Sequence, residues 1–168
     1  MEGHHNSNGT VDTVLQLTNT GALDYPIDIY YKMMETPFIQ KILPAMVNYF
    51  ETERYIFVHG WIPCEWIRQN AYAGTYFAIE HWREADEKQW RLARWINGMD
   101  AAHDGVTEVG KTIVCGHWHC SYGHSRYEGN GNEFGEKAEY SPYYGKGIIA
   151  IDACTVCSKK INCIVVED

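Results

Sequence analysis

The chain has 168 residues, of which 45% are hydrophobic and 21% are charged. This length allows one substantial core, so we expect a single domain over residues 1–168. The net charge of −8 argues against a nucleic-acid surface built on phosphate neutralisation. No segment reaches the roughly 20 apolar residues of a membrane span, and the amino terminus lacks the features of a signal peptide. We therefore expect no nucleic-acid or membrane partner and a cytoplasmic location.

The first fifty residues are predicted to be mostly helical. Residues 10–20 form a short helix that Gly21 ends, and residues 26–51 form helical segments broken at Pro37 and Pro44.

The middle of the chain predicts a buried strand and one long helix. The strand, Tyr55–Val58, ends in a His-Gly turn. The helix covers residues 80–101, because apolar residues recur at helical spacing and charged residues fill the other face. Three aromatic side chains are expected to pack this helix on a sheet, namely Trp82, Trp90 and Trp95.

The remaining segments predict further strands and a long loop. A strand is predicted near 113–116, and histidines follow it. Residues 121–146 are predicted to form a glycine- and tyrosine-rich loop. Two further strands, near 147–151 and 161–166, are predicted at the end of the chain. With the strand near 55–58, these strands are expected to form one mixed sheet. The predicted class is α/β, a mixed β-sheet with packed helices.

Two of the predicted strands end in the same way, with a histidine beside a glycine. His59 and Gly60 follow the first strand, and Gly116 and His117 follow the second, with His119 two residues later. Strand ends fix side chains, and glycine leaves room for an ion or substrate near the backbone. Imidazole suits divalent ions such as zinc, manganese and iron. The repeated pattern therefore indicates a metal site.

The six cysteines are expected to be free thiols, since the chain is large and carries no export signal. Cys154 and Cys157 form a C-x-x-C pair, which a redox or zinc site could use. A zinc ribbon needs a second such pair, and a redox motif should open a helix after a strand. Because both flanks are predicted to be β-strands, we interpret the pair as structural.

Three blocks of the sequence resemble the calcineurin-like metallophosphoesterases, in the branch of bacterial serine/threonine protein phosphatases. "YIFVHGWIP" (55–63) is similar to the family's V-H-G segment, and "IVCGHWH" (113–119) to its G-H-x-H segment. "GIIAIDACTVCSKKINCIVVED" (147–168) resembles its closing pair of strands. Weaker similarities lie in "NSNGTVDTVLQL", like the N-G-x-x-x-T helix start, and in "WRLARWINGM".

The family's first three motifs, D-x-H, G-D-x-x-D-R-G and G-N-H-E, do not occur in this sequence. The resemblance therefore implies the carboxy-terminal part of a metallophosphoesterase β-sandwich, whose partner would be the missing amino-terminal half of the domain. Without that half, one face of the sheet should be unusually apolar.

The resemblance also assigns roles to individual residues. It implies that His59 and His117 ligate one metal ion and that His119 reaches the other ion or the substrate. Arg94 matches the phosphate-binding arginine, with Arg91 as a competing candidate. Asp152 either orients a ligand histidine or caps the turn that follows it. The other histidines have no matched position and are interpreted as ordinary surface or loop residues: His4, His5, His81, His103 and His124.

The implied activity is hydrolysis of a phosphorylated substrate, either a phosphoprotein or a small phosphoester, by two divalent ions such as manganese, iron or zinc. Such ions activate a water and stabilise charge on the attacking and leaving oxygens. Because this chain would hold only some of the ligands, we expect weak metal binding and negligible activity of the chain alone.

Two alternatives stay open at this point. One is a non-catalytic binding module with a partial metal site, whose interface would be the segment from Tyr122 to Tyr144. The other is a mononuclear metal site built from His117, His119 and either Cys115 or Cys120.

Overall fold

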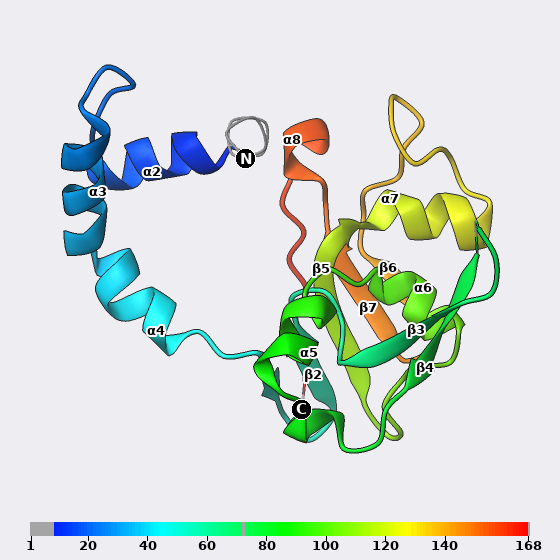
Figure 1. The fold of residues 1–168 in the computed structure, drawn as a ribbon. Helices are drawn as coiled ribbons and strands as arrows, with labels where there is room; N and C mark the ends of the chain where they lie inside the picture. Colours follow the sequence, from blue (N-terminus) through cyan, green and yellow to red (C-terminus); the bar gives the residue numbers. More distant parts are fainter. Residues whose placement is uncertain (1–8, 72, 168) are drawn as a thin grey trace. The chain divides into compact units, whose positions relative to one another are not determined.

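The computed structural model describes residues 9–71 and 73–167 (Figure 1). The chain divides into two compact units, Met1–Val47 and Asn48–Asp168, whereas the sequence analysis treats residues 1–168 as one domain. No helix in the described residues is long and apolar enough to cross a membrane.

The first unit consists of short helices. In chain order these are α2 (Thr10–Thr18), α3 (Pro26–Glu35), the π-helix η1 (Phe38–Ile42) and α4 (Leu43–Ala45). Proline suits the start of α3, since its fixed φ matches the first helical turn. None of these helices contains a buried residue. The predicted helix over residues 10–20 is confirmed, but it ends at Asn19, which adopts a left-handed conformation.

The second unit is built on a five-stranded mixed sheet with the order β1-β2-β5-β7-β6. The central strands β2, β5 and β7 pair in parallel, and β1 and β6 pair antiparallel at the edges. This arrangement confirms the predicted α/β class with a mixed sheet. The strands span Tyr49–Glu51 (β1), Tyr55–Val58 (β2), Thr112–His119 (β5), Tyr143–Gly145 (β6) and Ile148–Asp152 (β7).

One face of this sheet carries the core. Ile56, Ile113 and Ile148 lie side by side on neighbouring strands, and each is at most 1% exposed. Helix α6 (Gly98–His103) packs on β5 and β7 and contributes Met99 to the same core cluster. Trp61 is also fully buried there, and its indole nitrogen donates a hydrogen bond to the carbonyl of Val106 at 3.0 Å. Burial of these side chains is the main stabilising contribution to the unit.

The opposite face of the sheet carries apolar side chains that reach solvent at both edges. Phe50 on β1 and Tyr144 on β6 are 62% and 61% exposed. Phe50 lies opposite Phe57 in the ladder, and their ring centroids are 6.1 Å apart. Exposed apolar side chains therefore lie at both edges of this face, while Val114 at its centre is buried, and the unusually apolar face stays a prediction.

One strand prediction and one helix prediction are wrong. Residues 161–166 form no strand, although Asn162, Ile164 and Val166 alternate with more exposed neighbours. Strand β7 already has β5 on one side and β6 on the other, so its edges offer no place for this segment. Residues 49–51, predicted as helix, form β1 instead. A separate hairpin of β3 (Cys64–Arg68) and β4 (Gly74–Ala78) was not anticipated.

The long helix predicted over residues 80–101 is also wrong, because the chain forms three short helices there. These are the 3-10 helix η2 (Trp82–Glu84), α5 (Glu87–Ala93) and α6. Asp86 starts α5 with a capping box to Gln89, and the side chain of Asn97 caps α6. Trp82 and Trp90 are buried as expected, whereas Trp95 is 66% exposed.

The segment predicted as a loop over residues 121–146 contains regular structure. Helix α7 (Cys120–Gly123) continues into the π-helix η3 (His124–Glu128), and strand β6 follows. His124 is buried, and its ring nitrogens hydrogen-bond with Glu128 at 2.6 Å and with the carbonyl of Ser141 at 3.0 Å. His124 is therefore a buried, hydrogen-bonded residue of η3, whereas a surface or loop residue was expected. A last short helix, α8, spans Thr155–Ser158.

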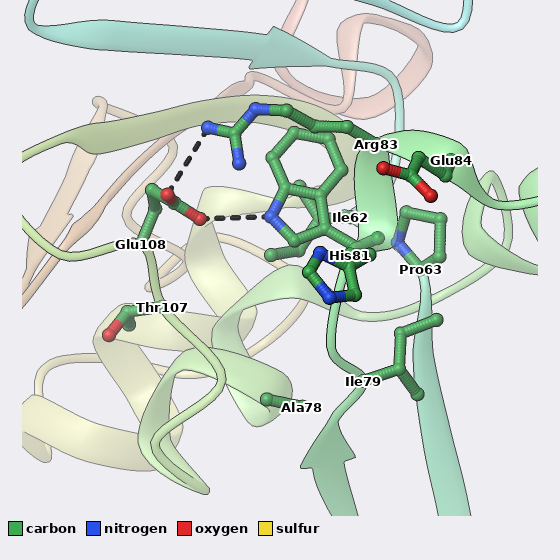
Figure 2. Close-up of a pocket in the computed structure, with 10 residues that line it drawn as sticks. Ile62, Pro63, Ala78, Ile79, His81, Arg83, Glu84, Thr107 and Glu108 are labelled. Atoms are coloured by element: carbon green, nitrogen blue, oxygen red, sulfur yellow. Dashed lines mark hydrogen bonds and ion pairs between the residues drawn. The ribbon is translucent and has the colours of Figure 1, made fainter.

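A charged network ties the edge strand β1 to the segments around it. Arg83 hydrogen-bonds with Glu51 at 2.6 Å and Glu108 at 3.2 Å, and Lys111 lies 3.0 Å from Glu51. Figure 2 shows Arg83 directed at Glu108, which also accepts a hydrogen bond from the indole nitrogen of Trp82 at 2.9 Å. The hydrogen bond from Arg83, together with Lys111 and against the effect of burial, lowers the pKa of Glu51 to about 2.

We predict that Glu51→Gln destabilises the protein at neutral pH but not in strong acid. The folded state holds Glu51 ionised at pH values where the unfolded chain would protonate it. The stabilisation is therefore complete above pH 4.5 and disappears as the pH falls towards 2. At pH 7 the expected loss is on the order of 1 kcal/mol, since the network is partly solvated.

Denaturant unfolding at several pH values measures this effect, with Glu65→Gln on the exposed side of β3 as the control. A loss that persists unchanged at pH 2 would contradict the assignment.

Candidate metal centre

The two histidines that follow neighbouring strands lie next to each other in the fold. His59 comes directly after β2, and His117 belongs to β5, the parallel neighbour of β2. Their ring centroids are 5.0 Å apart. The backbone nitrogen of Gly116 donates to the carbonyl of His59 at 2.9 Å, which extends the pairing beyond the end of β2. The convergence expected from the sequence is therefore present.

The turn after His59 is held by a close contact with helix α5. A Cβ atom at Gly60 would lie 2.6 Å from the carbonyl oxygens of Ala93 and Arg94, so no larger residue fits without movement. The next backbone nitrogen, of Trp61, donates to the Ala93 carbonyl at 3.0 Å. The end of α5 thus fixes the position from which His59 projects.

The backbone at His117 is unusual. Its φ is 65°, in the left-handed region that a non-glycine residue seldom adopts. The ladder between β5 and β7 also changes register between Cys115 and His119. Such irregularities redirect a side chain and often accompany functional sites. At this position the irregularity coincides with the histidine that faces His59.

The electrostatic surroundings favour the neutral form of His117. Burial, followed by the charge of His59, lowers the pKa of His117, and Asp152 opposes this shift. A neutral imidazole has a free nitrogen lone pair, which a metal ion or a proton requires. The indole of Trp95 meets the His117 ring edge-on at 5.2 Å. Trp95, expected in the core, instead contacts the candidate site.

The third predicted ligand, His119, has other partners in the structure. Its Nε2 lies 3.1 Å from a carboxylate oxygen of Glu133, and its ring lies 4.7 Å from that of Phe134. Its role as a ligand stays a prediction. Trp118 is half-buried against the core, and its ring stacks on that of His119 with centroids 6.1 Å apart.

Asp152 caps the turn after β7, one of the two roles proposed for it. Its Oδ1 accepts a hydrogen bond from the backbone nitrogen of Cys154 at 2.7 Å. Cys154 has a φ of 47° and starts α8, so the C-x-x-C pair opens a short helix after a strand. The strand predicted on its carboxyl side is absent. Burial raises the pKa of Cys154, which does not favour a reactive thiolate.

Arg94, predicted to bind phosphate, ends helix α5 beside Gly60. Its Nη2 donates to the side chains of Asn48 at 2.5 Å and Glu87 at 3.1 Å, and the side chain is 41% exposed. The guanidinium therefore already has two partners. Its role in phosphate binding stays a prediction.

The donor set at this centre consists of two imidazoles. Within residues 9–71 and 73–167, no group of three or more His, Cys, Asp or Glu side chains is arranged to hold a metal ion. His59 and His117 are the two imidazoles that the fold brings together here. His4 and His5 lie outside the described residues.

The cysteines considered for a mononuclear site are poor ligands in this fold. Cys115 and Cys120 are both buried, and the Cys120 thiol donates to the carbonyl of Ala150 at 3.1 Å. Burial raises the pKa of both thiols, that of Cys120 to about 11. Since metal ions bind the thiolate, this environment disfavours the mononuclear alternative.

Comparisons with known proteins found no matching family model, no matching curated protein and no matching solved structure.

We predict that Gly60→Ala disturbs the fold and that Gly116→Ala does not. The new methyl group at position 60 meets two carbonyl oxygens at 2.6 Å, whereas at position 116 the nearest atom is the His59 carbonyl oxygen at 3.7 Å. We expect a loss of about 1–3 kcal/mol for Gly60→Ala, typical of overpacking. Thermal or denaturant unfolding of both variants measures the difference, and equal stabilities would show that the turn is not held by α5.

Proposed function

We propose that His59 and His117 bind one divalent metal ion and that this chain contributes the pair to a centre that hydrolyses phosphoesters. The observation that carries the metal proposal is the 5.0 Å separation of their ring centroids. Two imidazoles that share one tetrahedral ion through bonds of about 2.0–2.1 Å place their ring centres roughly 5 Å apart. The apposition therefore supports a shared ion without a rearrangement of the strands.

The phosphoester substrate is inferred from the resemblance of the two histidine blocks to metallophosphoesterase motifs. The third block supports it less, since residues 161–166 do not form the strand that the resemblance implied. Manganese, iron and zinc all suit imidazole ligands. A second ion would need further ligands, and a complementary amino-terminal polypeptide is the proposed source of carboxylates.

Different residues of this chain would have different roles at the centre. His59 and His117 would hold an ion, which when bound supplies Lewis acidity and an activated water. Gly116, beside the pair and only half-buried, leaves space for a substrate oxygen. Arg94 would pair with the phosphate if its guanidinium exchanged Glu87 for substrate, because guanidinium and phosphate form bidentate hydrogen bonds.

We predict weak binding of zinc or manganese at one site per chain, and this binding should become weaker when either histidine is removed. His59→Ala and His117→Ala should each weaken affinity at least about tenfold, equivalent to about 1.4 kcal/mol. The control is His81→Ala, a histidine that lines a separate hollow of about 350 Å³ (Figure 2). Titration calorimetry measures the metal affinity of the unmodified chain and of the three variants. Binding that survives both single substitutions would refute the shared ion.

The metal affinity should also depend on pH. Protonated imidazole cannot bind a metal ion, so affinity falls once the pH drops below the ordinary histidine pKa of 6.5. Because the pKa of His117 is lowered, this histidine should lose its lone pair at a lower pH than an ordinary one does. The same shift means that the unfolded chain takes up the proton more readily, so His117 lowers stability as the pH falls below 6.5.

Non-catalytic binding is the second candidate function, and the pairing of Arg94 with Glu87 and of His119 with Glu133 favours it. Inorganic phosphate separates the two functions. The hydrolytic proposal predicts that phosphate binds the metal-loaded chain and that Glu87→Gln, which removes the carboxylate partner of Arg94 and leaves Asn48 in place, strengthens this binding. Phosphate affinity that is the same with and without metal would favour the binding module.

A further inference from the structure

A second hollow, of about 360 Å³, lies among the β3–β4 hairpin, α6, α7 and η3. Neither His59 nor His117 lines it. Most of its lining is aromatic or charged, and the residues that the argument uses are Trp66, Tyr76, Tyr122, Tyr127, Asp100 and Asp104. A hollow of this volume suits a small molecule or a single side chain.

Asp100 fixes two of the aromatic walls. Its Oδ1 accepts hydrogen bonds from the hydroxyls of Tyr122 at 2.8 Å and Tyr127 at 2.5 Å, and its Oδ2 accepts one from Asn97 at 3.1 Å. Burial and then the hydrogen bond to Asp100 raise the pKa of Tyr122 to about 12, so this phenol stays neutral. Because the two hydroxyls are already engaged, a ligand meets mainly the rings and the carboxylate charge.

The aromatic walls are also supported from behind. The ring of His103 stacks on that of Tyr127 with centroids 3.4 Å apart and planes 7° apart. The indole of Trp66 lies against Gly74, where any Cβ atom would overlap it. Tyr127 and Trp66 are therefore held in place before any ligand arrives.

The charges around the hollow favour a positive ligand. Asp104 is the second carboxylate, and it accepts a hydrogen bond from the backbone nitrogen of Tyr76 at 2.8 Å. Arg126 also lines the hollow, so its lining carries two carboxylates against one guanidinium. Arg68, outside the lining, has its guanidinium carbon 5.9 Å from the Trp66 ring centre. A cation bound here would be attracted by both aspartates and repelled by Arg126.

We propose that this hollow binds a quaternary or methylated ammonium group. Aromatic faces attract such cations through their quadrupoles, and nearby carboxylates add Coulomb attraction. A fully methylated ammonium donates no conventional hydrogen bonds, which matches walls whose hydroxyls are already bonded to Asp100. The site is independent of the His59–His117 pair and of any phosphoester activity.

Choline and its neutral isostere 3,3-dimethyl-1-butanol test the proposal in the full chain by titration calorimetry or NMR. We expect choline to bind at least about tenfold more tightly than the isostere, the factor that a partly desolvated cation–π site provides. His117→Ala should leave choline affinity unchanged. Equal affinities for the two probes, or no choline binding up to about 50 mM, would overturn the proposal.

Variants that change the charge of the hollow also test whether it binds cations, and they do not all depend on a single substitution that could disturb the fold. Asp104→Asn keeps an acceptor for the Tyr76 nitrogen and should weaken choline binding about three- to tenfold. Arg126→Gln should strengthen choline binding. Neither variant should change the affinity for the isostere. Trp66→Leu removes an aromatic wall from an exposed position and should also weaken binding. Glu136→Gln, exposed and outside the lining, is the matched control. Choline affinity that is unchanged in Asp104→Asn, or weaker in Arg126→Gln, would contradict the model of a cation site.

Discussion

The parallel pairing of β2 with β5 is the constraint on which the candidate centre depends. Its register places Tyr55, Ile56 and Phe57 beside Thr112, Ile113 and Val114, and the hydrogen bond between Gly116 and His59 continues it. A slip by one residue would move Ile56 and Ile113 out of the core, so burial locks the register. The same burial therefore fixes the separation of His59 and His117.

Prediction from the sequence succeeded where local pattern and burial agree. The strands at 55–58 and 147–151 are short apolar runs bounded by turn residues, and the structure has them. The helix over 80–101 failed because Asp86 and Asn97 are good caps, and capping divided an otherwise periodic segment. The strand at 161–166 failed because strand formation also depends on a pairing partner, and both sides of β7 are already taken by β5 and β6.

The same distinction applies to the candidate site. The strand-end histidines His59 and His117 could be inferred, since parallel neighbours align their carboxyl ends. The contact of Trp95 with His117 and the pairing of His119 with Glu133 could not, because they join segments whose arrangement no local pattern encodes. The cluster of Tyr122 and Tyr127 around Asp100 was missed for the same reason. Its only sequence signal was the density of tyrosines after residue 121.

The unusual backbone at His117 and the tight turn at Gly60 give the centre a consistent physical explanation. A left-handed residue in a strand costs on the order of 1–3 kcal/mol, and it persists only where the surroundings impose it. At this residue the ladder between β5 and β7 changes register, and the His117 ring lies 5.0 Å from the ring of His59. In the proposed centre, backbone packing would hold the two histidines in place before a metal ion binds, and the remaining coordination positions would be open to water, substrate or a partner.

Long-range proton–nitrogen NMR of the histidine side chains during zinc titration tests the central claim most directly. If His59 and His117 share one ion, the nitrogens of both rings shift together along one binding curve that fits one ion per chain, because one binding event perturbs both. Separate titrations of the two rings, or shifts confined to other histidines, would contradict the shared site.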